Sequence, residues 1–107
     1  MTAKEEIAKI AECIVNAVEV ERLYLFGSHA YGTPGEDSDY DFYMVIPDNG
    51  MRPLEAMGRA QNAVWDAKFR VSTDILANTV ELFDHRSKGA SMERKIVREG
   101  ILLYEHK

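Results

Sequence analysis

Apolar and polar positions near the start of the chain repeat first with a helical and then with an extended spacing. Thr2 and Glu5 have the spacing of a capping box, and apolar residues then recur every three or four positions, which predicts a helix over residues 2–18. Residues 22–26 form a short, nearly continuous apolar run of β-prone side chains, and Gly27 ends it. This run predicts an interior strand.

The middle of the chain shows the same alternation between the two spacings. Residues 39–46 predict a second strand, which begins polar on one face and ends apolar on both. Pro53 suits the first turn of a helix that extends to about Ala67. The expected core face of this helix contains four apolar residues, which are Leu54, Met57, Val64 and Trp65. Alternating residues over 69–76 predict a third strand, so Asp74 would lie inside a strand.

The last third of the chain predicts two helices and a short strand. Asn78 or Thr79 can begin a helix that ends near Gly89, residues 91–98 predict another helix, and residues 101–104 predict the last strand. Strands and helices therefore alternate along the chain. This order indicates an α/β or α+β fold, with a mixed sheet covered by helices in three layers at most.

The composition indicates one small acidic domain. The 107 residues are 46% hydrophobic, and no repeat or linker divides them, so we expect a single domain over residues 1–107. The 18 acidic and 13 basic residues give a net charge of -5, which argues against an extended surface for nucleic acid. No apolar run approaches the roughly 20 residues of a membrane span, and the chain does not begin like a signal peptide. A single cysteine, Cys13, excludes an internal disulfide, so we expect a cytoplasmic protein.

Two carboxylates of the second predicted strand would share one face of the sheet. Successive side chains of a strand alternate, so Asp39 and Asp41 would project together, with Cα atoms about 6.6 Å apart. At roughly 4–5 Å between the charges and an effective dielectric constant of about 20, their repulsion would be on the order of 3–4 kcal/mol. Asp74 on a neighbouring strand could supply a third carboxylate, and such oxygen ligands suit Mg²⁺. The pattern predicts a phosphoryl-transfer site with two magnesium ions.

The turn after the first strand has the features of a phosphate-binding segment. Gly27 lets the backbone approach a ligand closely, Ser28 offers a hydroxyl, and backbone amides at the start of a short helix favour anions. We therefore expect these two residues to hold the phosphates of a nucleotide opposite the metal ions.

Each of these patterns also has a purely structural explanation. An Asp-x-Asp pair at the start of a strand is often exposed turn residues or caps, and Asp74 could be a carboxylate at a sheet edge. Tyr31 and Tyr40 flank the motif and could stack on a base, but an aromatic residue beside a strand more often packs. The basic stretch over residues 85–98 is typical of a solvated helix face. If it is functional, it would meet an acidic partner or triphosphate oxygens.

The chain closely resembles the minimal nucleotidyltransferases of the DNA polymerase β superfamily. Their motif is Gly-Ser, ten residues and Asp-x-Asp, and this sequence matches it with Gly27-Ser28, residues 29–38 and Asp39-Tyr40-Asp41. Asp74, within Ser-Thr-Asp-Ile-Leu, falls where the family's third acid lies, and the ending Arg-Glu-Gly-Ile-Leu-Leu-Tyr-Glu is similar to the family's tail. The likeness covers nearly the whole chain and implies the nucleotidyltransferase fold.

The resemblance also implies a role for each motif residue. Gly27 and Ser28 would bind the β and γ phosphates, and Asp39 and Asp41 would hold both magnesium ions. Asp74 would bind one ion and help to deprotonate or orient an acceptor hydroxyl. The reaction would transfer a nucleoside monophosphate, AMP from ATP, and release pyrophosphate. Small relatives of this kind are often antitoxins that adenylylate and bind a HEPN-domain ribonuclease toxin, so the implied acceptor is a hydroxyl of such a partner.

Two further functions remain open at this stage. The chain could be a nucleotide-binding antitoxin or regulator that acts by contact alone, without turnover. It could also modify a small molecule such as an aminoglycoside, although 107 residues leave no room for the acceptor domain of larger relatives. The identity of the base, the acceptor atom and the oligomeric state do not follow from the sequence.

Overall fold

The computed structural model describes residues 2–32 and 39–107, and the predicted turn segment over residues 33–38 lies outside the described residues. In chain order the elements are α1 (Ala3–Ala17), β1 (Arg22–Phe26), α2 (Ser28–Tyr31), β2 (Tyr40–Ile46), α3 (Pro53–Asp66), β3 (Thr73–Thr79), α4 (Val80–Ser87), α5 (Met92–Glu99) and β4 (Ile101–Glu105). The first helix, the short helix after Ser28 and the last two helices all lie where the sequence predicts them. No described helix is long and apolar enough to cross a membrane.

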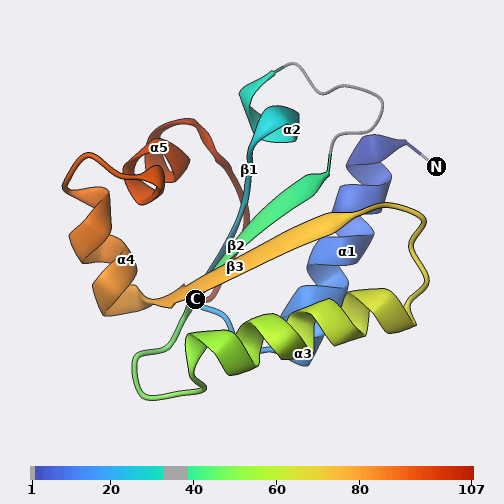
Figure 1. Cartoon of the computed structure of the whole chain (residues 1–107), viewed down its shortest axis with the longest axis horizontal. Helices are drawn as coiled ribbons and strands as arrows, with labels where there is room; N and C mark the ends of the chain where they lie inside the picture. Colours follow the sequence, from blue (N-terminus) through green and yellow to red (C-terminus); the bar gives the residue numbers. More distant parts are fainter. Residues whose placement is uncertain (1, 33–38) are drawn as a thin grey trace.

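The four strands form one mixed sheet in the order β3-β2-β1-β4 (Figure 1). β1 pairs antiparallel with both β2 and β4, whereas β2 and β3 run parallel. β1 is therefore an interior strand, as its apolar run predicts, and β3 is an edge strand. A parallel pair needs a crossover, and α3 provides it. The α+β prediction with a small mixed sheet flanked by helices is confirmed.

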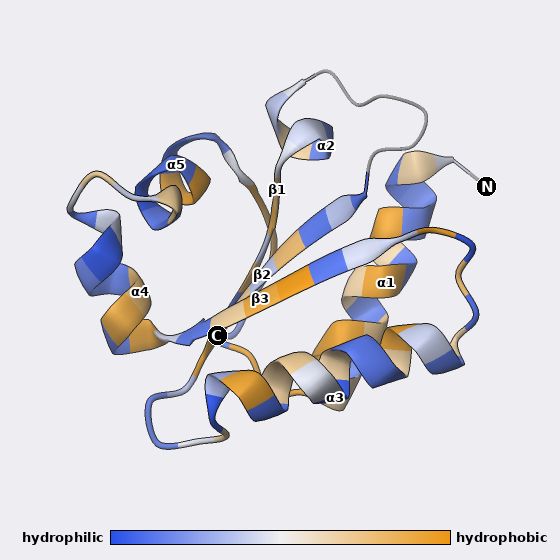
Figure 2. Ribbon diagram, viewed as in Figure 1, coloured by the Kyte–Doolittle hydropathy of each residue, from blue (hydrophilic) through white to orange (hydrophobic). Residues whose placement is uncertain are grey.

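Helices cover both faces of the sheet, so the molecule has three layers (Figure 1). On one face α1 and α3 pack over alternate strand residues such as Leu23, Phe42 and Met44. On the other face α4 and α5 contribute Phe83 and Ile96 to a smaller cluster, which they share with three intervening strand residues, Tyr24, Tyr43 and Val45. Figure 2 shows apolar stretches, in orange, along β2, β3, α1 and α3.

The ends of the helices follow from local sequence signals. Thr2 and Glu5 form the predicted capping box, in which the Thr2 hydroxyl accepts from the Glu5 amide and the Glu5 carboxylate accepts from the Thr2 amide. Thr79 and Ser91 cap α4 and α5 by accepting hydrogen bonds from the amides three residues on. These caps explain why the predicted starts of all three helices are confirmed.

The prediction that Leu54 and Trp65 belong to the core face of α3 is wrong. Their exposed fractions are 81% and 80%. The buried face of α3 is built instead on the residues Ala56, Ala60 and Val64, which are spaced four apart. The two alanines leave room for α3 to lie against α1, and this rotates Leu54 and Trp65 into solvent.

The third strand is displaced along the chain from its predicted position over residues 69–76. β3 is paired with β2 from Thr73 opposite Tyr40 to Thr79 opposite Ile46, so the length of β2 sets the bounds of β3. Residues 69–72 precede this register, although Phe69 and Val71 still pack against the core. The position of Asp74 inside a strand is confirmed.

Candidate active site

The turn after β1 brings Gly27 next to the second strand. Phe26, the last residue of β1, is the register partner of Asp41 in β2, so the next residue along the chain lies at the same end of the sheet. Gly27 has a φ of +74°, a region that L side chains rarely adopt. A Cβ atom at this position would also collide with the carboxylate of Asp41. Both observations make glycine a requirement at position 27.

Ser28 begins the short helix α2 beside the carboxylates. The carbonyl of Gly27 accepts hydrogen bonds from the amides of Ala30 and Tyr31, at 3.0 and 2.9 Å, which closes the single turn. Ser28 is half-buried. The two residues expected to bind phosphate therefore lie at the same end of the sheet as Asp41.

Asp41 and Asp74 are register partners on the parallel strands β2 and β3. Their side chains leave the sheet on the face that carries Tyr43 and Leu76, because side chains two residues apart in a strand share a face. Burial, the charges of Asp74 and Asp39 and a hydrogen bond with Asp74 raise the pKa of Asp41, while the charge of His29 opposes this. The carboxyls thus lie within contact distance and repel one another when both are charged.

Asp39 immediately precedes β2 and is exposed, whereas the sequence places it within the strand. Its charge acts on Asp41, so the three predicted acids lie at the same end of the sheet. Among residues 2–32 and 39–107, however, no three His, Cys, Asp or Glu side chains are close enough to one another to form a metal-binding group. The pair of Asp41 and Asp74 is in contact, and Asp39 stands further out.

The donor set fits a hard divalent cation. Two carboxylates side by side repel each other, and a bound cation would supply the compensating positive charge. Carboxylate oxygens are the ligands that Mg²⁺ prefers, and the half-buried setting of Asp41 strengthens the attraction.

The aromatic residues of the motif have packing roles. Tyr40 is buried at 5% exposure, its ring lies edge-on to His29 with 4.5 Å between centroids, and its hydroxyl donates to Glu6 at 2.7 Å. Burial and the hydrogen bond to Glu6 raise the pKa of Tyr40 to about 12. The interpretation of Tyr40 as a packing residue is thus supported. His29 is half-buried against that ring.

The structure also shows two contacts near the site that the sequence did not predict. The Nζ atom of Lys95 on α5 lies 4.5 Å from the centroid of the Tyr31 ring, which places a cation beside α2. Gln61 of α3 donates to the Thr73 hydroxyl at 3.0 Å, directly before Asp74. These pairs join residues far apart in the chain, and only the basic composition around Lys95 gave any signal of them.

The sequence likewise does not predict a buried carboxylate behind the site. Glu93 of α5 is only 3% exposed, and its carboxylate accepts from the Tyr43 hydroxyl at 2.8 Å. The Nε atom of Arg86 lies 3.2 Å from its Oε1 atom, in an alignment too poor for a hydrogen bond. The basic stretch over residues 85–98, interpreted as a solvated helix face, therefore contains one buried carboxylate, which pairs with the exposed Arg86.

The family model of the polymerase beta nucleotidyltransferases matches residues 8–107. Among solved structures, a candidate nucleotidyltransferase from Sulfolobus solfataricus has a TM-score of 0.63 at 19% identity, over 95% of this chain and 79% of that one. A toxin–antitoxin with AMP-PNP has a TM-score of 0.57 at 20% identity, over 92% and 73% of the two chains. The toxin–antitoxin MntA-HpeT, in mutant form, has a TM-score of 0.62 at 19% identity with the same coverage. No curated protein matches the chain.

Because the family model covers nearly the whole chain, the protein belongs to the polymerase beta nucleotidyltransferase family and is a nucleotidyltransferase.

Proposed function

We propose that this protein transfers AMP from ATP to a hydroxyl of a partner protein and thereby acts as the antitoxin of a HEPN-type toxin in the cytoplasm. The observation that carries the transfer is the contact of Asp41 with Asp74 next to a glycine turn that has no room for a side chain. Residues 1–107 would serve as one catalytic domain.

Each residue of the site has a role that its position supports. Gly27 and Ser28 would bind the β and γ phosphates, where the backbone approaches most closely. Asp39, Asp41 and Asp74 would hold two Mg²⁺ ions, which, when bound, neutralise the phosphate charge. Asp74 is exposed at the edge of the sheet, so it is accessible to a hydroxyl of another protein.

The transfer is an in-line displacement. The acceptor oxygen attacks the α-phosphorus and forms the new ester bond, the bond from that phosphorus to the bridging oxygen of the β-phosphate breaks, and pyrophosphate leaves. Asp74 orients the hydroxyl and accepts its proton. Catalysis would come chiefly from positioning. The turn at Gly27 would hold the phosphates on one side of the reacting phosphorus, and the carboxylates would lie on the other side.

The proposed partner rests on two kinds of support. The sequence resembles minimal nucleotidyltransferases that accompany HEPN toxins, and two structural neighbours are toxin–antitoxin structures, one of them with AMP-PNP.

Labelling of a candidate toxin tests the proposal. The purified protein, the product of an adjacent helical reading frame, Mg²⁺ and ATP labelled at the α-phosphate should yield a labelled toxin. The double variant Asp39→Asn with Asp41→Asn should abolish the label and leave the complex intact, because neither change removes apolar surface. Label that persists in the double variant would contradict the assignment of these carboxylates.

A second function is favoured by one observation, the exposed position of Asp39 outside β2, which leaves only Asp41 and Asp74 in contact. The protein could then bind nucleotide without turnover and neutralise its partner by contact. The same experiment distinguishes the two functions. A toxin that is inhibited in the complex but never labelled, with wild-type protein and Mg²⁺ present, would establish inhibition by contact. If the acceptor were instead a small hydroxylated molecule such as an aminoglycoside, that molecule would carry the label, and the protein would form no complex with the toxin.

A further inference from the structure

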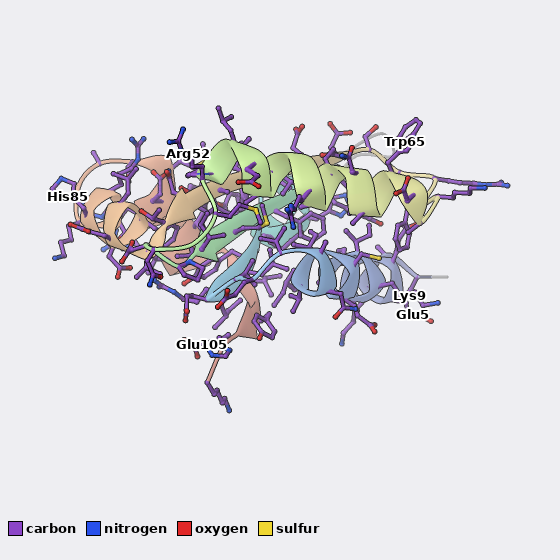
Figure 3. All side chains as sticks on the ribbon, turned by 90° about the horizontal axis from the view of Figure 1, so that it is seen from below. Glu5, Lys9, Arg52, Trp65, His85 and Glu105 are labelled. Carbon is purple, nitrogen blue, oxygen red and sulfur yellow. The ribbon has the colours of Figure 1, made fainter. Side chains whose placement is uncertain are left out.

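The outer flank of α3 carries two large apolar side chains that nothing in the described chain covers. Leu54 and Trp65 are the most exposed large hydrophobic residues, at 81% and 80%. They lie eleven residues apart, which is three helical turns plus about 20°, so both project from the same flank of the helix. Along the helix axis they are about 16 Å apart. Figure 3 shows Trp65 projecting away from the body at one end of this helix. Single exposed leucines are common, but tryptophan is enriched among the residues that dominate protein–protein interfaces, and here a leucine is aligned with it.

Gly58 lies between them on the same side of the helix. A glycine inside a helix costs about 1 kcal/mol relative to alanine. A Cβ atom at this position would meet nothing within 4 Å, so packing within the chain does not require a glycine there. A missing side chain at the middle of a solvent-facing helix does allow the backbone of another helix to approach closely.

The opposite flank of the same helix carries charges that complement one another end to end. Arg52 lies at the N-cap and Asp66 at the last residue of α3, and both are exposed. Neither has an ion pair within the described part of the chain. Between them, Arg59 is already neutralised by Glu55, with 3.7 Å between Nη2 and Oε2. The helix is therefore positive at its first turn and negative at its last on this flank.

We infer that α3 is the interface of a homodimer, in which a second copy packs antiparallel across Gly58. A two-fold axis near residues 59 and 60 would place Leu54 beside the Trp65 side chain of the other copy and Arg52 beside its Asp66. A two-fold axis perpendicular to both helices places the same flank of the two copies on the same side of the interface. The apolar contacts therefore lie on one side of the line between the two helices, and the ionic contacts lie on the other. A hollow of about 560 Å³ beside Trp65, bordered by Phe69 and Arg70, has room for the incoming leucine.

The mass in solution and the fluorescence of one residue test the dimer directly. Light scattering over a dilution series should show a mass that rises from 12.1 kDa towards twice this value. Trp65 is the only tryptophan, so its emission should shift to shorter wavelength as the mass rises. Leu54→Glu should abolish both changes. Leu82→Glu is the matched control, because Leu82 is also an exposed leucine on a helix, at 42%, and should leave both changes intact.

A charge exchange tests the antiparallel arrangement. Arg52→Asp and Asp66→Arg should each weaken dimerisation on the order of tenfold by opposing like charges, and the double variant should restore it. Neither change threatens the monomer, because aspartate is a good N-cap and arginine suits the last turn of a helix. A monomer at every concentration, a dimer that Leu54→Glu leaves unchanged, or a double variant as weak as the single ones would overturn the inference. Binding of a different protein to this flank of a monomeric chain would overturn it as well.

Discussion

Asp41 on β2 and Asp74 on β3 lie directly opposite each other in the parallel register, and their carboxyls are in contact. The contact is fixed by backbone pairing rather than by a loop, because seven successive residue pairs join the two strands. The arrangement brings two negative charges together at the end of a sheet. Without a cation, this must cost the protein stability.

Replacing Asp74 with asparagine should therefore have opposite effects on stability and on activity. In the absence of metal, Asp74→Asn removes one charge of the repelling pair and should stabilise the fold on the order of 1 kcal/mol. The same change should abolish nucleotidyl transfer. Thermal unfolding in EDTA and transfer assays with Mg²⁺ measure the two effects. Asp48→Asn is the control, because Asp48 is an exposed aspartate away from the site that accepts a hydrogen bond from the Glu81 amide.

Gly27→Ala should damage nucleotide binding more than stability. The alanine must adopt a φ of +74°, which costs roughly 1–2 kcal/mol, and its Cβ forces the Asp41 side chain to rotate away. We expect the melting temperature to fall by a few degrees and calorimetric binding of MgATP to be lost. Gly50→Ala is the matched control, because a Cβ there makes ordinary contacts of 3.6 Å with Pro47 and should change neither. Normal MgATP affinity in Gly27→Ala would separate this turn from nucleotide binding.

The sequence predicts the parts of this molecule that depend on local signals. Caps at Thr2, Thr79 and Ser91 mark the helix starts, and the apolar run of β1 marks the interior strand. The spacing of glycine, serine and aspartates predicts which residues meet at the site. All of these signals lie within a few residues of the feature that they specify.

The features that were missed depend on partners distant in the chain. Periodicity alone could not show that two alanines select the buried face of α3 and leave Trp65 in solvent. The bounds of β3 follow from the length of β2, and the burial of Glu93 follows from Tyr43, fifty residues away. In each case the three-dimensional neighbour decides the outcome, and a single sequence does not identify that neighbour.

Magnesium should control how strongly ATP stabilises the protein. A ligand that binds only the native state raises the melting temperature, by an amount that follows its affinity. If the carboxylates and the triphosphate share metal ions, MgATP should raise the melting temperature clearly and ATP with EDTA much less. Asp39→Asn with Asp41→Asn should reduce the shift with MgATP to the level seen with EDTA. Equal shifts with and without the metal would contradict shared coordination.

The ion pair of the buried Glu93 with the exposed Arg86 should make stability depend on pH. Burial tends to raise the pKa of Glu93, but hydrogen bonds from Tyr43 and the backbone and the charge of Arg86 outweigh it, so the pKa lies below its ordinary value of 4.5. A carboxylate with a lowered pKa stabilises the fold above the unfolded-state value, and this contribution is lost as pH falls through the folded-state value.

Glu93→Gln should accordingly destabilise the protein at neutral pH, by about 1–3 kcal/mol, because the buried Tyr43 hydroxyl loses its charged acceptor. The difference from wild type should shrink steadily as pH falls below about 4.5, since the wild-type carboxyl then becomes neutral as well. Urea unfolding at a series of pH values measures this difference. Glu12→Gln, which changes an exposed glutamate of α1, should show no comparable pH dependence. A difference that stays constant across the acid range would mean that the charge of Glu93 contributes nothing and that only its shape matters for packing.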